Sequence, residues 1–306
     1  MQSGRLTAET YVTTLIARAD ALTDLRALIS INRTGALTAA RAVDATRKAG
    51  APVGALAGLP IIVKDNINTR ELPTTGGTPA LKNVQPTANA PSLQKLIDAG
   101  AILLGKANMH ELAFGITSTN LAPFAGPVKN PYDRTRIPGG SSGGTAASIA
   151  ARIAPAGLGT DTGGSARIPA ALCGVVGLRP SVGNGGAQRR YTDTNAVVPI
   201  SHTRDTVGVL GRTVADVALL DTVISGRAAP APIGLQGLRI GVPASFWAGL
   251  DNSLSSIVTA AKSKLASAGV AFIDVDTTGL SALNDNVSFQ IALHEPIADI
   301  PAYLAA

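Results

Sequence analysis

The stretch GLGTDTGGSARIPAA occupies residues 157–171 and decides most of what the sequence says about fold and chemistry. It opens as an apolar, strand-like segment and then sets Ser165 directly behind two glycines. Asp161 lies four residues before this serine and Arg167 two residues after it. Glycines allow the backbone to approach a ligand closely and to turn its N–H groups toward it. The pattern therefore indicates a reactive or ligand-binding loop.

Short motifs in the two serine loops allow several interpretations. Gly139-x-Ser141-x-Gly143 matches a nucleophile elbow, but it lies in a glycine run and no convincing Asp and His follow it. Asp161-Thr-Gly matches an aspartic protease pattern, but the second copy needed for a carboxylate pair is missing. An anion-binding glycine loop is the best non-enzymatic alternative, although no P-loop lysine is present. For either loop alone, a tight turn without a function is also open.

Lys64 adds a second observation. Residues 59–63 read LPIIV, which predicts a buried strand ending next to this lysine. A strand-end lysine ordinarily extends its amine to solvent. If Lys64 is buried instead, its pKa falls and the neutral amine can take a proton from a serine where no histidine is available. Together with the serine loops, Lys64 favours a serine nucleophile with a lysine base.

Three ordered motifs then carry a resemblance to the amidase signature family. They are Val63-Lys-Asp-Asn66, Gly139-Gly-Ser-Ser-Gly-Gly144 and the stretch 159–171, with Ser141 and Ser165 placed 24 positions apart. The similarity runs from the first expected helix to the end of the chain. It implies that Ser165 is the nucleophile, that Ser141 is a bridging serine with a cis peptide, and that Lys64 is the base. Ser142 is implied as a supporting hydroxyl.

The resemblance also implies an oxyanion hole in the loop before the nucleophile. Its donors would be the backbone N–H groups of Thr162, Gly163 and Gly164, with that of the nucleophilic serine itself. Preorganised donors of this kind stabilise a developing oxyanion by about 2.7 to 4 kcal/mol for one donor. Asp161 and Arg167 are not needed for the proton relay, so we expect them to hold the loop or to position substrate.

The expected fold is α/β: the amidase signature fold, with a central mixed sheet covered by helices on both faces. We expect a single domain over residues 1–306, with N-terminal helices at about 7–49 and a catalytic core at about 55–306. Thr7 is the expected N-cap of the first helix. Members of the family usually continue further, so the chain is expected to be C-terminally short and, if whole, to expose a sheet edge or an apolar face.

The expected secondary structure alternates between helices and strands. The expected helices are 7–28, 35–49, 91–99, a short one from 108, one from the glycine loop to about 154, 166–172, 213–224, 253–268 and 286–305. The last of these is expected to be kinked or broken at Pro296 and Pro301. The expected strands are 59–63, 101–104, 156–160, 175–178, 238–242 and 270–275. Residues 181–200 are expected to form a loop.

Composition limits the partners and cofactors. The chain of 306 residues has a formal charge of +6, but its 26 basic residues are scattered, so no nucleic acid is expected as a partner. The three histidines, at positions 110, 202 and 294, lack the Cys or Glu partners of a zinc motif, so neither a metal nor a cofactor is expected. The single Cys173 fits a reducing, cytoplasmic location. No secretion signal and no run of about 18 apolar residues is visible, so no membrane partner is expected.

The substrate is indicated only by resemblance. The segment 190–206 is similar to family members that hydrolyse arylacetamides such as mandelamide and indoleacetamide, which implies a small amide with an apolar side chain. Branches that cleave carbamates, anilides or fatty amides remain alternatives. The A-type subunit of a glutamine-dependent aminoacyl-tRNA amidotransferase is a further one, disfavoured by this segment and by the lack of a basic patch. A homodimer is the oligomer expected if the chain associates.

Overall fold

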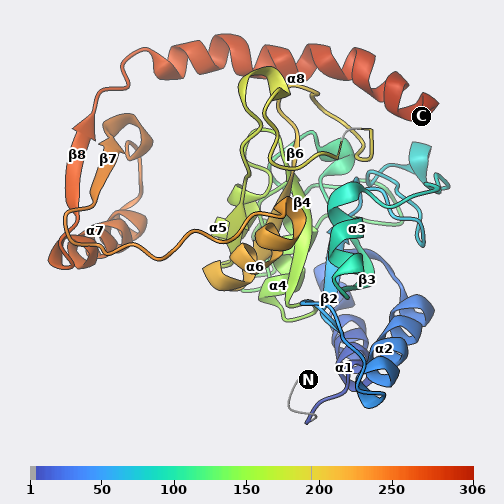
Figure 1. Cartoon of the computed structure of the whole chain (residues 1–306). Helices are drawn as coiled ribbons and strands as arrows, with labels where there is room; N and C mark the ends of the chain where they lie inside the picture. The colour runs from blue at the N-terminus through green and yellow to red at the C-terminus, as the bar shows by residue number, and fades with distance from the viewer. Residues whose placement is uncertain (1–4, 194) are drawn as a thin grey trace. The chain divides into compact units, whose positions relative to one another are not determined.

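The computed structural model describes residues 5–193 and 195–306 (Figure 1). The chain divides into two compact units. Unit 1 comprises the residues up to Ala229 together with His294–Ala306, and unit 2 comprises Pro230–Leu293. Each unit is described by itself.

Unit 1 is built on a six-stranded mixed sheet with the strand order β1-β3-β2-β4-β6-β5. The central strands β3, β2 and β4 are parallel, whereas β1 pairs antiparallel with β3, and β6 pairs antiparallel with both β4 and β5. The mixed α/β sheet confirms the predicted fold class. The strands are β1 (Leu28–Ile31), β2 (Pro60–Lys64), β3 (Ile102–Ala107), β4 (Ala156–Asp161), β5 (Val176–Leu178) and β6 (Thr206–Gly211).

Helices cover both faces of this sheet. On one face, side chains of α3 and α6 pack on Ile61, Val63 and Val209 in a large apolar cluster. On the other face, α1 and α2 pack on Ile62 and α4 packs near Leu210. Burial on two sides explains the uninterrupted apolar run of the central strands. The helices of unit 1 are α1 (Ala8–Asp20), α2 (Arg33–Lys48), α3 (Pro91–Asp98), α4 (Gly143–Ala150), α5 (Arg167–Leu172), α6 (Val214–Ser225) and the C-terminal part of α8 (Leu280–Ala305).

Parallel pairing of β2 with β4 positions the site. Lys64 is the last residue of β2 and Asp161 the last residue of β4, so both lie at the carboxyl ends of neighbouring parallel strands. In α/β sheets, ligands bind outside the carboxyl ends of the strands. The motif that contains Lys64 and the stretch 159–171 therefore meet at the carboxyl ends of the central strands.

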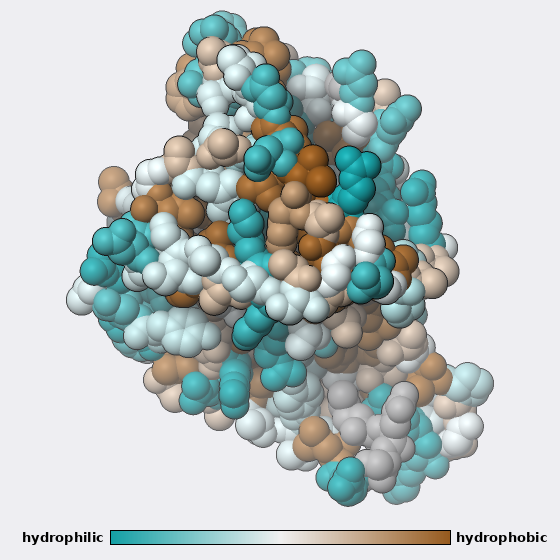
Figure 2. Space-filling view, turned by 90° about the vertical axis from the view of Figure 1, so that its left-hand side faces the viewer, coloured by the Kyte–Doolittle hydropathy of each residue, from teal (hydrophilic) through white to brown (hydrophobic). Residues whose placement is uncertain are grey.

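Unit 2 contains a two-stranded parallel sheet of β7 (Arg239–Pro243) and β8 (Ala271–Val275), joined by α7 (Asn252–Ser267), and the first part of α8. None of the residues of α7 is buried. The face drawn in Figure 2 shows apolar residues at the surface among hydrophilic ones. The large exposed apolar side chains of unit 2 are Ile233, Leu235, Phe246, Trp247, Leu254, Ile257, Ile273, Val275, Leu280, Leu283, Val287, Phe289 and Leu293.

Two strands of unit 1 were not predicted. β6 reads TVGVLG and lies between the expected loop 181–200 and the expected helix 213–224, where no element was predicted. A side chain at Gly208 would meet the Leu178 carbonyl oxygen at 2.7 Å. Close packing, not turn formation, requires this glycine. β1 begins at Leu28, the last residue of the predicted helix 7–28. That helix ends at Asp20 because the chain turns through a 3-10 helix (Thr23–Leu25) and a left-handed residue, Arg26.

Other helix boundaries also differ from the prediction. The helix expected from residue 108 is only a three-residue 3-10 turn, Glu111–Ala113, because Leu112 adopts a positive φ of 52°. The loop 181–200 includes a 3-10 turn at Asn184–Gly186. α8 starts at Leu280 and continues through Pro296 and Pro301, so the expected break does not occur. Among the helices in the described parts of the chain, none combines the length and the apolar character needed to cross a bilayer.

One glycine of α4 tests how closely the glycine loop is packed. A methyl group at Gly144 would overlap the backbone carbonyl oxygens of Asn108 and Ala27. We predict that Gly144→Ala lowers the free energy of unfolding of unit 1 by about 3 kcal/mol, because backbone atoms cannot move aside. Gly234→Ala is the control, since nothing lies within 4 Å of its added methyl group. Equal chemical denaturation midpoints for the two variants would contradict the packing.

Candidate active site

Lys64 is fully buried at the end of β2, and its amine is surrounded by hydroxyl groups. Its Nζ lies 2.7 Å from Ser141 Oγ and 2.6 Å from Thr160 Oγ1. Burial lowers the pKa of Lys64 to about 7, against the opposing charges of Asp161 and Asp205. A large fraction of Lys64 is therefore neutral at physiological pH and able to accept a proton.

Ser141 lies in the glycine loop that opens α4, and its side chain is buried. The Gly140–Ser141 peptide bond is cis, as the resemblance implied. The loop approaches its neighbours closely, because a side chain at Gly140 would meet Ser118 N at 2.6 Å. The carbonyl oxygen of Ser141 accepts hydrogen bonds from His110 N at 3.1 Å and from Ser118 Oγ at 3.3 Å. These contacts hold the Ser141 hydroxyl against Lys64.

Ser142 connects α4 to the end of β4 through the backbone. Its hydroxyl donates to the Thr160 carbonyl oxygen at 3.1 Å and accepts from Thr160 N at 3.2 Å. Its own N–H donates to the Ser165 carbonyl oxygen at 3.1 Å. Ser142 therefore fixes the two serine loops relative to each other, and its hydroxyl is used in doing so.

Ser165 lies in the turn between β4 and α5 and is 6% exposed. Within the described residues, its side chain makes no hydrogen bond to that of Ser141. Catalytic hydrogen bonds are often long without substrate and tighten when it binds. The structure therefore brings Lys64 and Ser141 into contact. Ser165 lies next to Ser142 in space, but the hydrogen bond between the Ser141 and Ser165 hydroxyls that the expected relay needs is not formed among the described residues.

The backbone N–H groups of Gly163, Gly164 and Ser165 differ in their hydrogen bonding. Gly164 N donates to Asp161 Oδ1 at 2.8 Å, and its φ of +123° favours glycine. The N–H groups of Gly163 and Ser165 have no acceptor within the part of the chain that the structure describes. Nothing lies within 4 Å of the position that a side chain at Gly163 would take. Open space and a free donor thus coincide at Gly163.

Asp161 organises this loop. Its carboxylate accepts hydrogen bonds from Gly164 N and, at 3.2 Å, from Ala166 N. It also forms ion pairs with Arg167 and with Arg179, both at 3.0 Å. Burial alone would raise the pKa of Asp161, but the hydrogen bonds and charge of Arg167 hold it below its usual value. Asp161 therefore remains a carboxylate that fixes the loop.

Three residues of this region were not singled out by the sequence. Thr160 contacts the lysine amine, Arg179 pairs with Asp161, and Asp205 accepts a hydrogen bond from Thr162 Oγ1 at 2.5 Å. Arg179 lies eight residues beyond the stretch 159–171, and Asp205 lies within the segment 190–206, but neither segment marks these residues individually. Thr160 lies within the stretch 159–171, one residue before Asp161.

Fold and site together define an α/β protein in which a buried lysine and two serines meet at the carboxyl ends of parallel strands. The chain belongs to the amidase family, whose profile, described as Amidase, matches residues 10–305. It is 46% identical over 286 residues to indoleacetamide hydrolase of Agrobacterium vitis, which covers 93% of this chain. It is 40% identical over 306 residues to mandelamide hydrolase of Pseudomonas putida, which covers 99% of this chain.

The structure is also similar to native peptide amidase from Stenotrophomonas maltophilia. The TM-score is 0.85 at 32% sequence identity, covering 99% of this chain and 65% of that one. The chain spans 59% of the length of each of the two hydrolases.

Adjacent glycines provide a matched test of the loop geometry. Gly164→Ala should lower the free energy of unfolding by about 1–3 kcal/mol, because its φ is strained for alanine and its methyl group would meet Ile168 Cδ1 at 2.7 Å. Gly163→Ala should fold normally but slow labelling of Ser165 by a fluorophosphonate about tenfold, because the methyl group enters the space before the free N–H. Thermal unfolding and intact mass measure the two effects. Equal destabilisation by both changes, or unchanged labelling of Gly163→Ala, would contradict this geometry.

Proposed function

We propose that the protein is an amidase that hydrolyses the C–N bond of a small carboxamide through an acyl-enzyme on Ser165. The observation that carries the proposal is the buried Lys64 amine, 2.7 Å from Ser141 Oγ and with a pKa lowered to about 7. Such an amine is a proton acceptor next to a serine relay. Membership of the amidase family supports amide chemistry at this site.

In the first half of the reaction, neutral Lys64 takes the proton of Ser141, and Ser141 takes the proton of Ser165. The Ser165 oxygen attacks the amide carbonyl carbon, and the carbonyl oxygen becomes an oxyanion. The proposed donors to this oxyanion are the N–H groups of the loop from Thr162 to Gly164 and of Ser165. Among the residues that the structure describes, the N–H groups of Gly163 and Ser165 have no acceptor.

In the second half, the relay returns the proton to the leaving nitrogen, the C–N bond breaks and an amine or ammonia departs. Water then attacks the ester of Ser165, its proton passing to Lys64 through Ser141. Release of the carboxylic acid restores the Ser165 hydroxyl. No cofactor or metal enters these steps, and Asp161 with Arg167 holds the loop without exchanging protons.

The proposed substrate is an aryl- or alkyl-acetamide. The relatives with 46% and 40% identity are named for indoleacetamide and mandelamide, two amides with an aromatic ring close to the amide group. We further propose that the chain forms one amidase signature domain and acts in the cytoplasm without nucleic acid. Cleavage of carbamates or anilides, or service as an amidotransferase A-type subunit, is the alternative that a substrate panel separates.

The substrate prediction is direct. The purified protein should release ammonia from indole-3-acetamide and mandelamide without a partner protein. Ser165→Ala and Lys64→Ala should each lower kcat by about 10⁴-fold or more, because they remove members of one catalytic unit. Lys82→Ala, which changes an exposed lysine, is the control. Turnover that survives Ser165→Ala, or a Lys64→Ala kcat equal to that of the native protein, would overturn the proposed mechanism.

The pH dependence follows from the sign of the Lys64 pKa shift. The base must be neutral, and the pKa of Lys64 is about 7. We therefore predict that kcat/KM falls about tenfold per pH unit below roughly pH 7 and levels above it. A profile measured from pH 5.5 to 9 tests this. Constant kcat/KM down to pH 5.5 would contradict a lysine base.

A further inference from the structure

Asp205, the residue immediately before β6, ends the loop 200–205 and contacts the loop of the nucleophile through Thr162. We propose that Asp205 is a positioning residue of the active site, which fixes the loop 162–164, here called the oxyanion loop, through the hydroxyl of Thr162. The loop 200–205, to which Asp205 belongs, is in turn held by the C-terminal part of α8. The inference rests on the proposed amidase function and concerns the same site.

Both oxygens of the Asp205 carboxylate have protein donors. Oδ1 accepts from Thr162 Oγ1 at 2.5 Å. Oδ2 accepts from Ile200 N at 2.7 Å and from Ser201 N at 2.9 Å. Pairing of Thr206 with Asp161 across β6 and β4 brings Asp205 to the first residue of the oxyanion loop. The carboxylate orientation is therefore fixed by three donors from two segments.

The oxyanion loop is thus held at both of its ends by carboxylates. Asp205 holds the side chain of Thr162, and Asp161 holds the N–H of Gly164. Gly163, with its free N–H and the open space beside it, lies between these anchors. A donor that must point at a developing charge gains from such immobilisation, because it needs no reorganisation during the reaction. Loss of the Asp205 anchor should therefore weaken transition-state stabilisation more than substrate binding.

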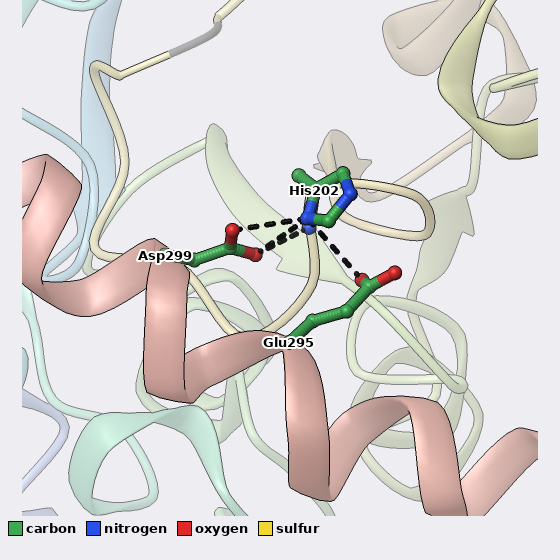
Figure 3. Close-up of side chains that lie close together, drawn as sticks. All are labelled: His202, Glu295 and Asp299. Atoms are coloured by element: carbon green, nitrogen blue, oxygen red, sulfur yellow. Dashed lines mark hydrogen bonds and ion pairs between the residues drawn. The ribbon is translucent and has the colours of Figure 1, made fainter.

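The loop 200–205 is itself clamped to α8 within unit 1. Ser201 and Thr203 donate through their hydroxyls to Glu295, the latter at 2.8 Å. His202 N donates to Asp299 Oδ2 at 2.8 Å, and its ring Nδ1 lies 2.9 Å from Asp299 Oδ1 (Figure 3). His202, Glu295 and Asp299 offer potential metal-ligand atoms within 4.8 Å of one another, but these side chains already join the loop to the helix. The loop that contains Asp205 is therefore held in place by hydrogen bonds to α8.

The charge of Asp205 gives a second, separable effect. The titratable groups that act on Lys64 are Asp161, Asp205 and the half-buried His110. The carboxylates favour the ammonium form of Lys64, so removal of one should lower its pKa further. Asp205→Asn keeps an oxygen for the Thr162 hydroxyl but removes the charge, whereas Thr162→Val removes the hydrogen bond and keeps the charge.

The test combines Asp205→Asn, Asp205→Ala, Thr162→Val and the double variant Asp205→Ala/Thr162→Val, assayed on indole-3-acetamide. Asp205→Ala and Thr162→Val should each lower kcat about 10- to 100-fold with KM within about threefold of the native value. The double variant should lose no more than the worse single one, because both changes break one contact. Asp205→Asn should shift the acidic limb of kcat/KM to lower pH, Thr162→Val should leave it in place, and Thr162→Ser should restore kcat.

The control is Asp44→Asn, which removes a carboxylate that accepts hydrogen bonds from Ala8 N at 2.8 Å and from Glu9 N at 2.9 Å and does not contact the oxyanion loop. Its kcat and pH profile should match those of the native protein. Additive losses in the double variant, or an unshifted limb in Asp205→Asn with kcat intact, would overturn the proposal.

The rate of Ser165 labelling by a fluorophosphonate separates this proposal from the proposed function. If the native protein is labelled but cleaves no amide, the amidase assignment fails, and the same pattern in labelling rates still supports or refutes the role of Asp205. If folded native protein is not labelled at all, both proposals are overturned. Circular dichroism melts establish that each variant is folded. If Asp205→Ala does not fold, Thr162→Val still tests the contact between Asp205 and Thr162.

Discussion

The site depends on a buried amine, that of Lys64, which donates to two hydroxyl groups and, among the described residues, forms no ion pair with a carboxylate. A second buried lysine shows the contrast. Lys106 lies on β3 in register with Val63, next to Lys64, and its amine lies 3.7 Å from Asp65 and 2.6 Å from the Ile67 carbonyl oxygen. Burial lowers the pKa of Lys106 only to about 8, because Asp65 favours its charged form. The same residue type is thus an ion-pair partner on one strand and a candidate base on the next.

The backbone supplies the remaining constraints. Parallel pairing of β2 and β4 brings Lys64 beside the loop of Ser165, and Ser142 ties the glycine loop of α4 to β4. Asp161 and Asp205 then hold the oxyanion loop from its two ends. Each anchor is a charge-assisted or backbone hydrogen bond in a buried setting, where such bonds define geometry strongly. The proposed chemistry therefore rests on the rigidity of the support as much as on Lys64, Ser141 and Ser165.

The sequence was sufficient where local signals agreed with tertiary structure. Thr7 caps α1, accepting from Thr10 N at 3.0 Å as predicted, and the buried strand before Lys64 forms as β2. The motifs also came together at one edge of the sheet. β6 was missed because its glycines serve sheet packing, and Asp205 because its partner is 43 residues away in sequence. Contacts of that kind depend on strand pairing, which no local pattern in this chain specified.

The central claim, that Lys64 is neutral over much of the physiological pH range, is most directly tested by NMR titration of protein carrying ¹³Cε-labelled lysine. The account predicts one lysine resonance with a midpoint near pH 7 that is absent from Lys64→Met, and a second near pH 8 that is absent from Lys106→Met. The exposed lysines should titrate near their ordinary value of about 10.4. A Lys64 resonance that titrates with the exposed lysines would contradict the account, because a permanently charged amine cannot serve as the base.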